Sequence, residues 1–352
     1  MRVSPHVPAS PARSASVIMG RQDYLSVVLR LIGMELYKLR RRAMSKALGI
    51  IAVALAVLPF ALIAFGAFAT ANAPAGSFSP SCQSPPPGSQ AQTGAPPSCP
   101  TPSPAQIAQE RQSIVEGASV PLRLPEALNV AVEYGLIVGI VLLVILIGSI
   151  AGGEYSAGTI RLLFIRGPTR TQFLIAKLGA SFIVIVIGIL VMTALGILIG
   201  QLFNPVSGIA QTGAFWSGAW LGHALLYLCI ALLNWFMFAA IAIFFATLGR
   251  STAAGVVAGI GWLFAEPILG GVLTLLGDVT RGAAGNILKA IPNYFINTNF
   301  SALLNDQGQY LSFSASSTPA VSVPHAIIVL LVYFAFFIGL TWWIQKRRDV
   351  TN

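Results

Sequence analysis

The segment EYSAGTIRLLFIRGPTRTQFLIAK, residues Glu154–Lys177, places several charges and a Gly-Pro pair between two long apolar runs. The run before it covers Leu128–Gly152, and the run after it covers Phe173–Phe203. Each run reaches the roughly 20 residues that a helix needs to cross the hydrocarbon core of a bilayer. The polar segment must therefore lie in water or at the membrane surface, and it joins two membrane-spanning segments.

The composition of the whole chain agrees with a membrane protein. Hydrophobic residues make up 55% of the 352 positions and charged residues only 9%, which is too few for the surface of a soluble domain. Further apolar runs of spanning length cover Lys46–Thr70, Trp216–Leu248, Ala253–Leu276 and Ala326–Gln345. Only helices and closed barrels cross a bilayer, and these runs lack the alternation of barrel strands. The sequence predicts an all-α membrane protein with six transmembrane helices.

The basic residues fix the expected orientation of these helices. With six spans, both termini lie on one side, and so does the Glu154–Lys177 segment. Of the 21 Lys and Arg residues, all but Arg111, Arg123, Arg281 and Lys289 fall on that side. The positive-inside rule therefore places both termini in the cytoplasm. The net charge of +10 is explained by this topology, and we do not expect a nucleic-acid partner.

The chain divides by composition into an N-terminal part, a membrane domain and a short tail. We expect a disordered cytoplasmic N-terminus, an amphipathic interfacial helix, the six-helix membrane domain and a cytoplasmic tail over residues 1–21, 22–45, 46–346 and 347–352. Within the membrane domain, an outer loop covers 71–127, with a short helix expected over Ile107–Gly117. A second outer region, 277–325, retains apolar stretches and is expected to dip back toward the membrane as short helices.

Glycine and cysteine positions add two smaller expectations. Pairs of glycines four residues apart recur in the spans and allow close helix contacts: Gly135/Gly139, Gly148/Gly152, Gly196/Gly200, Gly218/Gly222 and Gly255/Gly259. Cys82 and Cys99 lie in the outer loop, where an oxidising compartment would allow a disulfide. The alternative is that both thiols stay free.

Motifs for chemistry within the chain itself are absent from the sequence. No Gly-x-x-x-x-Gly-Lys-Ser/Thr loop occurs, so the chain does not bind ATP in the usual P-loop manner. The three histidines, His6, His223 and His325, are scattered without neighbouring acids or thiols. We therefore expect no catalytic residue, no metal site and no cofactor in this chain.

The polar segment itself has the pattern of a short helix. Ile160, Leu163 and Phe164 fall on one helical face, the Gly167-Pro168 pair ends that helix, and Thr169 is placed to cap the next one. Such a helix can dock in a groove of a soluble subunit, with its arginines facing an acidic rim. The alternative is a solvated loop whose charges only set the topology.

The same segment resembles the signature of type-2 ABC transporter permeases. The residues that carry the resemblance are Glu154, Gly158, Thr159, Leu163, Pro168, Arg170 and Lys177. The order of parts, from a basic interfacial helix through six spans to a basic tail, is also similar. The sequence departs from the family at Ile160, where leucine is common, and in its Pro-rich outer loop.

This resemblance implies a bacterial plasma-membrane permease that works with other subunits. Two cytoplasmic ATPase subunits, with ATP and Mg²⁺, would grip this chain and a second permease copy or paralogue, and the complex would export an amphipathic peptide, drug or lipid. The residues implied in coupling to the ATPase are Glu154, Gly158, Thr159, Ile160, Arg161, Leu163, Phe164, Pro168, Arg170 and Lys177. We also expect Glu154 to form an ion pair with Arg161 or Arg170.

One acid inside a span leaves a different function open. Glu266, followed by Pro267, is predicted within the fifth span, and intramembrane acids often serve function. It would face a central pathway or the permease partner, or else begin an outer re-entrant segment if the span ends early. As alternatives to an ABC permease, the chain would be an ATP-independent transporter or channel that uses Glu266, or a membrane assembly factor.

Overall fold

A computed structural model describes residues 24–73, 103–122, 124–158, 169–203, 217–280, 282–311 and 320–347. The regular structure of these ranges is helical throughout. Six helical segments are long and apolar enough to cross a membrane: Ala43–Thr70, Glu126–Ser156, Arg170–Leu202, Gly218–Gly249, Thr252–Thr280 and Val323–Arg347. The predicted all-α fold with six membrane helices is confirmed.

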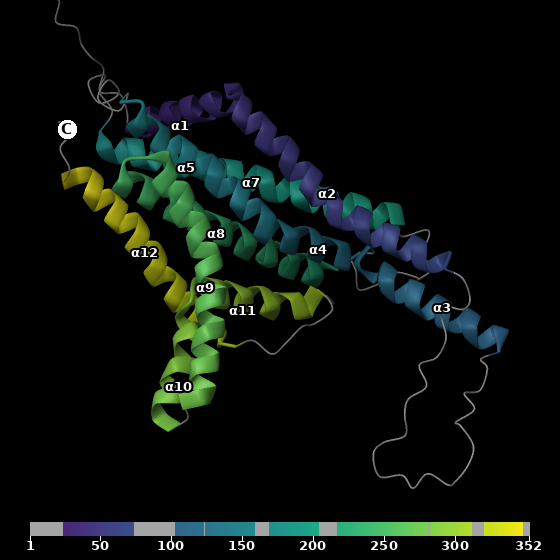
Figure 1. Ribbon diagram of the computed structural model, residues 1–352. Coiled ribbons are helices and arrows are strands. Elements are labelled where there is room, and N and C mark those ends of the chain that lie inside the picture. The colour runs from purple at the N-terminus through teal and green to yellow at the C-terminus, as the bar shows by residue number, and fades with distance from the viewer. Residues whose placement is uncertain are drawn as a thin grey trace, which may run out of the picture.

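The N-terminal helices form an elbow. Helix α1 (Tyr24–Arg41) and helix α2 (Ala43–Ala71) meet at Arg42, whose backbone is extended, so the two helices run in different directions (Figure 1). Helix α3 (Pro104–Ser119) is the short outer helix expected from the sequence, and it ends in a 3₁₀ turn, η2 (Val120–Leu122). Ser103 caps α3 because its hydroxyl accepts a hydrogen bond from the Gln106 N–H while the Gln106 side chain accepts one from the Ser103 N–H.

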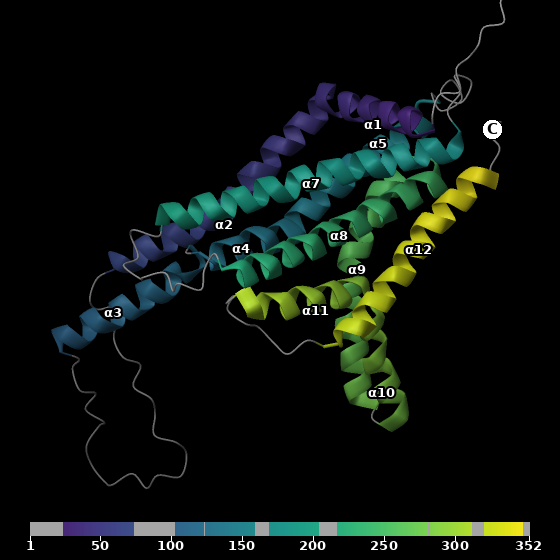
Figure 2. The same ribbon diagram turned by 180° about the vertical axis from the view of Figure 1, so that it is seen from behind.

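The second span is one continuous helical segment, Glu126–Ser156, made of three consecutive helices. Helix α4 (Glu126–Tyr134) passes through a π-helical turn, η3 (Gly135–Gly139), into α5 (Ile140–Ser156). The third span is α7 (Arg170–Phe203) and the fourth is α8 (Gly218–Gly249). Helix α8 is the most enclosed of the six spans, and it lies among α5, α7, α9 and α12 (Figure 2).

Four of the five glycine pairs lie at close helix contacts. Gly148 and Gly152 of α5 face α9, and a Cβ on Gly255 of α9 would come within 2.8 Å of the Ala242 carbonyl oxygen of α8. Gly196 and Gly200 of α7 face α4 and Leu124 in the same way. Gly218 and Gly222 instead meet open space. Small residues therefore set the spacing of α5, α8 and α9.

The last third of the chain forms the outer helices and the final span. After a turn at Arg250, whose φ is +50°, α9 (Thr252–Thr280) leads to α10 (Gly282–Ala290), which folds back along it. The 3₁₀ turn η4 (Ile291–Tyr294) precedes α11 (Ile296–Gly308), which packs on α8 and α12 and ends in η5 (Gln309–Leu311). These are the short helices in the region for which the sequence predicted them.

The arrangement brings several helix ends together. The end of α5, the start of α7, the start of α1 and the end of α12 (Val323–Arg347) lie at the same end of the molecule (Figure 1). It is the end for which the positive-inside rule predicted a cytoplasmic location. Helix α5 therefore ends, and α7 begins, at this end of the bundle.

Candidate functional site

The carboxylate of Glu154 joins three helices, α1, α5 and α7, at this end of the bundle. Its Oε1 accepts a hydrogen bond from Lys38 Nζ of α1 at 2.8 Å, and its Oε2 lies 2.9 Å from Lys177 Nζ of α7. Only 8% of Glu154 is exposed. The predicted residues Glu154 and Lys177 are therefore in direct contact, with a lysine from the interfacial helix added to them.

A second acid completes this group, which we call the ionic quartet: Glu35, Lys38, Glu154 and Lys177. Lys38 Nζ also donates to Glu35 Oε1 at 2.9 Å, and Lys177 Nζ lies 3.9 Å from Glu35 Oε2. Glu35 and Lys177 are each 4% exposed. Two acids and two bases balance, so the burial of these charges is compensated within the group.

Other contacts hold Lys177 in place. Its Nζ donates to the Ile150 carbonyl oxygen at 3.3 Å and lies 4.7 Å from the centre of the Phe173 ring. The ammonium group thus has a carboxylate, a carbonyl oxygen and an aromatic face around it. Lys177 of α7 therefore contacts each of the last two turns of α5, at Ile150 and at Glu154.

Lys38 is the quartet member nearest to water. Partial burial by itself lowers the pKa of its ammonium group, but the hydrogen bonds and charges of Glu154 and Glu35 outweigh this effect and raise the pKa above its usual value. Lys38 therefore stays protonated throughout the physiological range. The bridge between α1 and α5 is correspondingly permanent at neutral pH.

The other end of the α5–α7 segment is attached to the last span. Arg170 Nη1 donates to the carbonyl oxygens of Gln345 at 2.9 Å and Lys346 at 3.1 Å, where α12 ends. Trp342 Nε1 donates to Thr171 Oγ1 at 3.3 Å. Cations near a helix C-terminus satisfy carbonyl groups that have no partner within the helix. Arg170 thus binds the start of α7 to the end of α12.

Both boundaries of the segment have local caps. Gly158 follows the end of α5 with φ +66°, a conformation that favours glycine, and its N–H donates to the Tyr155 carbonyl oxygen at 3.2 Å. The predicted cap at Thr169 is confirmed, since its hydroxyl accepts a hydrogen bond from the Gln172 N–H at 3.2 Å. The predicted residues Thr159, Ile160, Arg161, Leu163, Phe164 and Pro168 lie outside the described residues.

Glu154 forms ion pairs, but with Lys38 and Lys177 and not with the expected Arg170. The structure places Lys38 and Lys177 against its carboxylate and directs Arg170 to carbonyl oxygens of α12, while Arg161 lies outside the described ranges. Sequence reasoning missed Glu35 and Lys38. Glu35 was recognisable as an acid that shares the apolar face of the interfacial helix with Val28, Leu31 and Leu39.

Glu266 lies within α9, and its carboxylate accepts hydrogen bonds from the start of helix α11. Its Oε1 accepts hydrogen bonds from Trp262 Nε1 at 2.8 Å and from the Ile296 N–H at 3.0 Å, and its Oε2 accepts one from the Asn297 N–H at 2.8 Å. The carboxylate therefore caps the start of α11. Helix α9 continues through Pro267 to Thr280, so the idea that the fifth span ends at Glu266 is wrong.

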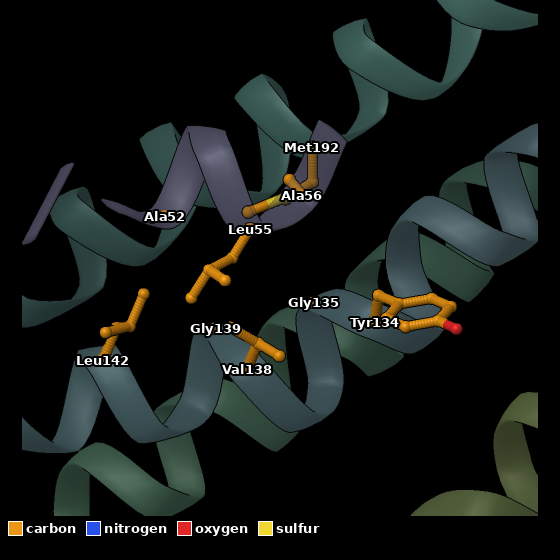
Figure 3. Close-up of a pocket in the computed structure, with 9 residues that line it drawn as sticks. All are labelled: Ala52, Leu55, Ala56, Tyr134, Gly135, Val138, Gly139, Leu142 and Met192. Carbon is orange, nitrogen blue, oxygen red and sulfur yellow. The ribbon is translucent and has the colours of Figure 1, made fainter. Parts of the chain in front are cut away.

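An apolar crevice lies in the membrane-spanning part, between α2, η3 and α7 (Figure 3). Its empty space, open mouth included, is about 210 Å³. The residues that line it are Ala52, Leu55, Ala56, Tyr134, Gly135, Val138, Gly139, Leu142 and Met192. It contains none of the predicted site residues and no charged group.

Among the described residues, no group of three or more His, Cys, Asp or Glu side chains is placed to hold a metal ion.

Cys82 and Cys99 lie outside the described residues, so their pairing stays a prediction.

A comparison with curated proteins finds none that matches this chain. A comparison with protein families finds one that covers α4 to α12, including Glu154, Arg170 and Lys177 but not α1. Residues 123–351 match the family described as "Protein of unknown function (DUF2705)", and because this is more than half of the 352 residues, the chain belongs to that family.

Proposed function

We propose that the chain is the membrane-spanning permease subunit of an ABC exporter. A separate ATPase subunit hydrolyses ATP with Mg²⁺, and its movement is passed through the segment between α5 and α7 to the spans. The spans then export an amphipathic peptide, drug or lipid. The chain supplies no catalytic residue of its own.

The observation that carries this proposal is the attachment of both ends of the segment to other helices. At its start, Glu154 contacts Lys38 of α1 and Lys177 of α7. At its end, Arg170 contacts the carbonyl oxygens of Gln345 and Lys346 in α12. A displacement of the segment would therefore move α1, α7 and α12 together with α5, as transmission from a docked ATPase requires.

One further contact extends this connection to the central helix. The Tyr155 side chain lies next to the side chains of Thr247 in α8 and Gln345 in α12. Helix α8 is the most enclosed of the spans, so its position constrains its neighbours. The residues next to the segment thus reach the core of the bundle. In the proposal, two ATPase subunits act on two such segments, one in this chain and one in a second permease copy or paralogue.

The alternative of an ATP-independent transporter or channel has less support. That mechanism would use Glu266 to bind a coupling ion. Three hydrogen-bond donors already occupy the two oxygens of this carboxylate, and two of them belong to the backbone of α11. Such a group is suited to holding two helices together. Within the described ranges, no structural feature favours the assembly-factor alternative.

The proposal can be tested by co-purification in mild detergent from the native host. The test variant is Arg161→Glu with Arg166→Glu, which inverts two charges of the segment and leaves the Arg170 contact to α12 intact. The control is Lys289→Glu, a single charge inversion on the outer side. A P-loop ATPase that accompanies the wild type and the control but not the test variant would support the proposal. Absence of any ATPase from intact protein in all three samples would overturn it and favour the ATP-independent transporter.

A further inference from the structure

Helix α1 presents three different strips along its length. The first strip is buried and contains Val28, Leu31, Glu35 and Leu39, which pack largely on α7. This strip attaches α1 to the bundle. The other two strips face away from the bundle.

The second strip is apolar and exposed. Leu25 is 66% exposed and Leu29 is 58% exposed, whereas Leu36 on the same helical side is partly buried and packs against the core. It lies next to the buried strip. An apolar strip beside the attachment surface of a helix that precedes a membrane span fits into the acyl boundary of a leaflet.

The third strip is basic. Arg30, Tyr37 and Arg41 recur at offsets of seven and eleven residues, which places them on one side of the helix. The Arg41 guanidinium lies 5.4 Å from the centre of the Tyr37 ring. Arg40, Arg42 and Lys46 continue the positive charge around the elbow into α2. Clusters of four to eight basic residues directly cytoplasmic of a span are typical of binding to anionic lipids.

We propose that α1 and the elbow bind anionic phospholipids of the cytoplasmic leaflet, and that the ionic quartet passes the resulting position of α1 to Glu154. The lipid headgroups would contact the basic strip, and their acyl chains would surround Leu25 and Leu29. Lipid binding by α1 is independent of the proposed function. Only the consequence for coupling to an ATPase rests on the proposed function.

The quartet is suited to transmit a shift of α1. Lys38 reaches Glu154 from α1 at 2.8 Å, and Glu35 lies on the same helix one turn earlier. Glu35 Oε2 has no hydrogen-bond partner and is 3.9 Å from Lys177 Nζ. A small crevice borders Glu35, Lys177 and Ser181. The 2.8 Å bond from Lys38 to Glu154 is therefore the direct connection from α1 to α5.

The experiment uses the purified full chain in nanodiscs of phosphatidylcholine, with and without phosphatidylglycerol, and measures amide hydrogen exchange over residues 24–41 and 150–158. In the wild type, we expect phosphatidylglycerol to slow exchange in both regions. Arg30→Gln with Arg41→Gln should weaken the response of α1, by roughly fivefold in lipid affinity for each arginine. Lys289→Gln, a charge removed on the outer side, should leave both responses unchanged.

A second variant separates lipid binding from transmission. Lys38→Met removes the hydrogen bond from α1 to Glu154, so it should keep the response of residues 24–41 and lose the response of residues 150–158. The proposal is overturned if phosphatidylglycerol leaves the wild-type α1 unchanged, which would leave an acidic protein surface as the partner of the basic strip. Transmission is overturned if Lys38→Met responds like the wild type over residues 150–158. Because no ATPase is present, neither result depends on whether the chain is an ABC permease.

Discussion

Lys38 donates a hydrogen bond to Glu154 at 2.8 Å although 116 positions separate them in the chain. The contact joins helix α1, which the sequence predicts to be interfacial, to the last turn of the second span. Together with Lys177 and Glu35 it makes the end of α5 a meeting point of three helices. The segment that follows α5 therefore begins from a fixed position.

Glu154→Gln should weaken this meeting point. The substitution keeps the shape of the side chain but leaves Lys177 buried without a full counter-charge, and breaking a buried pair in this way costs about 3–5 kcal/mol. We expect a lower midpoint of unfolding in detergent titrations and faster hydrogen exchange over residues 24–41. Asp278→Asn is the matched control, because its partner Lys289 is exposed and such pairs contribute about 0–1 kcal/mol. Equal effects of the two substitutions would contradict the prediction.

Alanine substitutions at Gly255 and Gly218 should have different effects on stability, because only Gly255 lies at a close helix contact. Gly255→Ala should destabilise the chain by about 1–3 kcal/mol, because the new methyl group would meet the Ala242 carbonyl oxygen and the Ala246 side chain. Gly218→Ala on α8 should be neutral or slightly stabilising, because a Cβ there meets open space and alanine favours the helix. Unfolding midpoints of the two variants in the same detergent measure the difference. A neutral Gly255→Ala would mean that α8 and α9 can separate without loss of stability.

The sequence predicted the spans well because hydropathy is a local property. All six apolar runs became helices, and Thr169 became a cap as its position before α7 indicated. Contacts between distant segments were harder to foresee. Nothing local to Glu154 shows that Lys38 approaches it, and nothing local to Glu266 shows that its partners are backbone groups of α11. The glycine pattern likewise predicted helix contacts but could not separate Gly218 from Gly255, since only the assembled bundle decides which glycines face another helix.

The raised pKa of Lys38 predicts how the attachment of α1 depends on pH. A raised pKa in the folded state means that the stabilisation is complete below the unfolded value of about 10.4 and is lost as the pH rises through the folded value. The charged groups that face Lys38 are Glu35 and Glu154, with Lys177 beyond them. A spin label at Leu25→Cys should therefore keep its mobility across the neutral range and become more mobile only in alkaline solution.

Lys38→Met provides the comparison for this titration. Without the titrating ammonium, the label at position 25 should be more mobile at neutral pH, and its alkaline transition should be smaller. Release of α1 near neutral pH in the otherwise unchanged chain would contradict the raised pKa. The same result would also rule out Lys38 as the permanent bridge to α5.

Glu266→Gln distinguishes a structural role from a role in transport. The amide keeps one acceptor oxygen but places an NH₂ group against a backbone N–H, either of Ile296 or of Asn297, so a buried donor loses its partner at a cost of about 1–3 kcal/mol. We expect faster hydrogen exchange over residues 296–300 and a lower unfolding midpoint. Glu110→Gln on the exposed helix α3 is the control. If Glu266→Gln instead kept wild-type stability and abolished export, the carboxylate would act on a substrate or ion, and the ATP-independent mechanism would gain the support that the geometry now withholds.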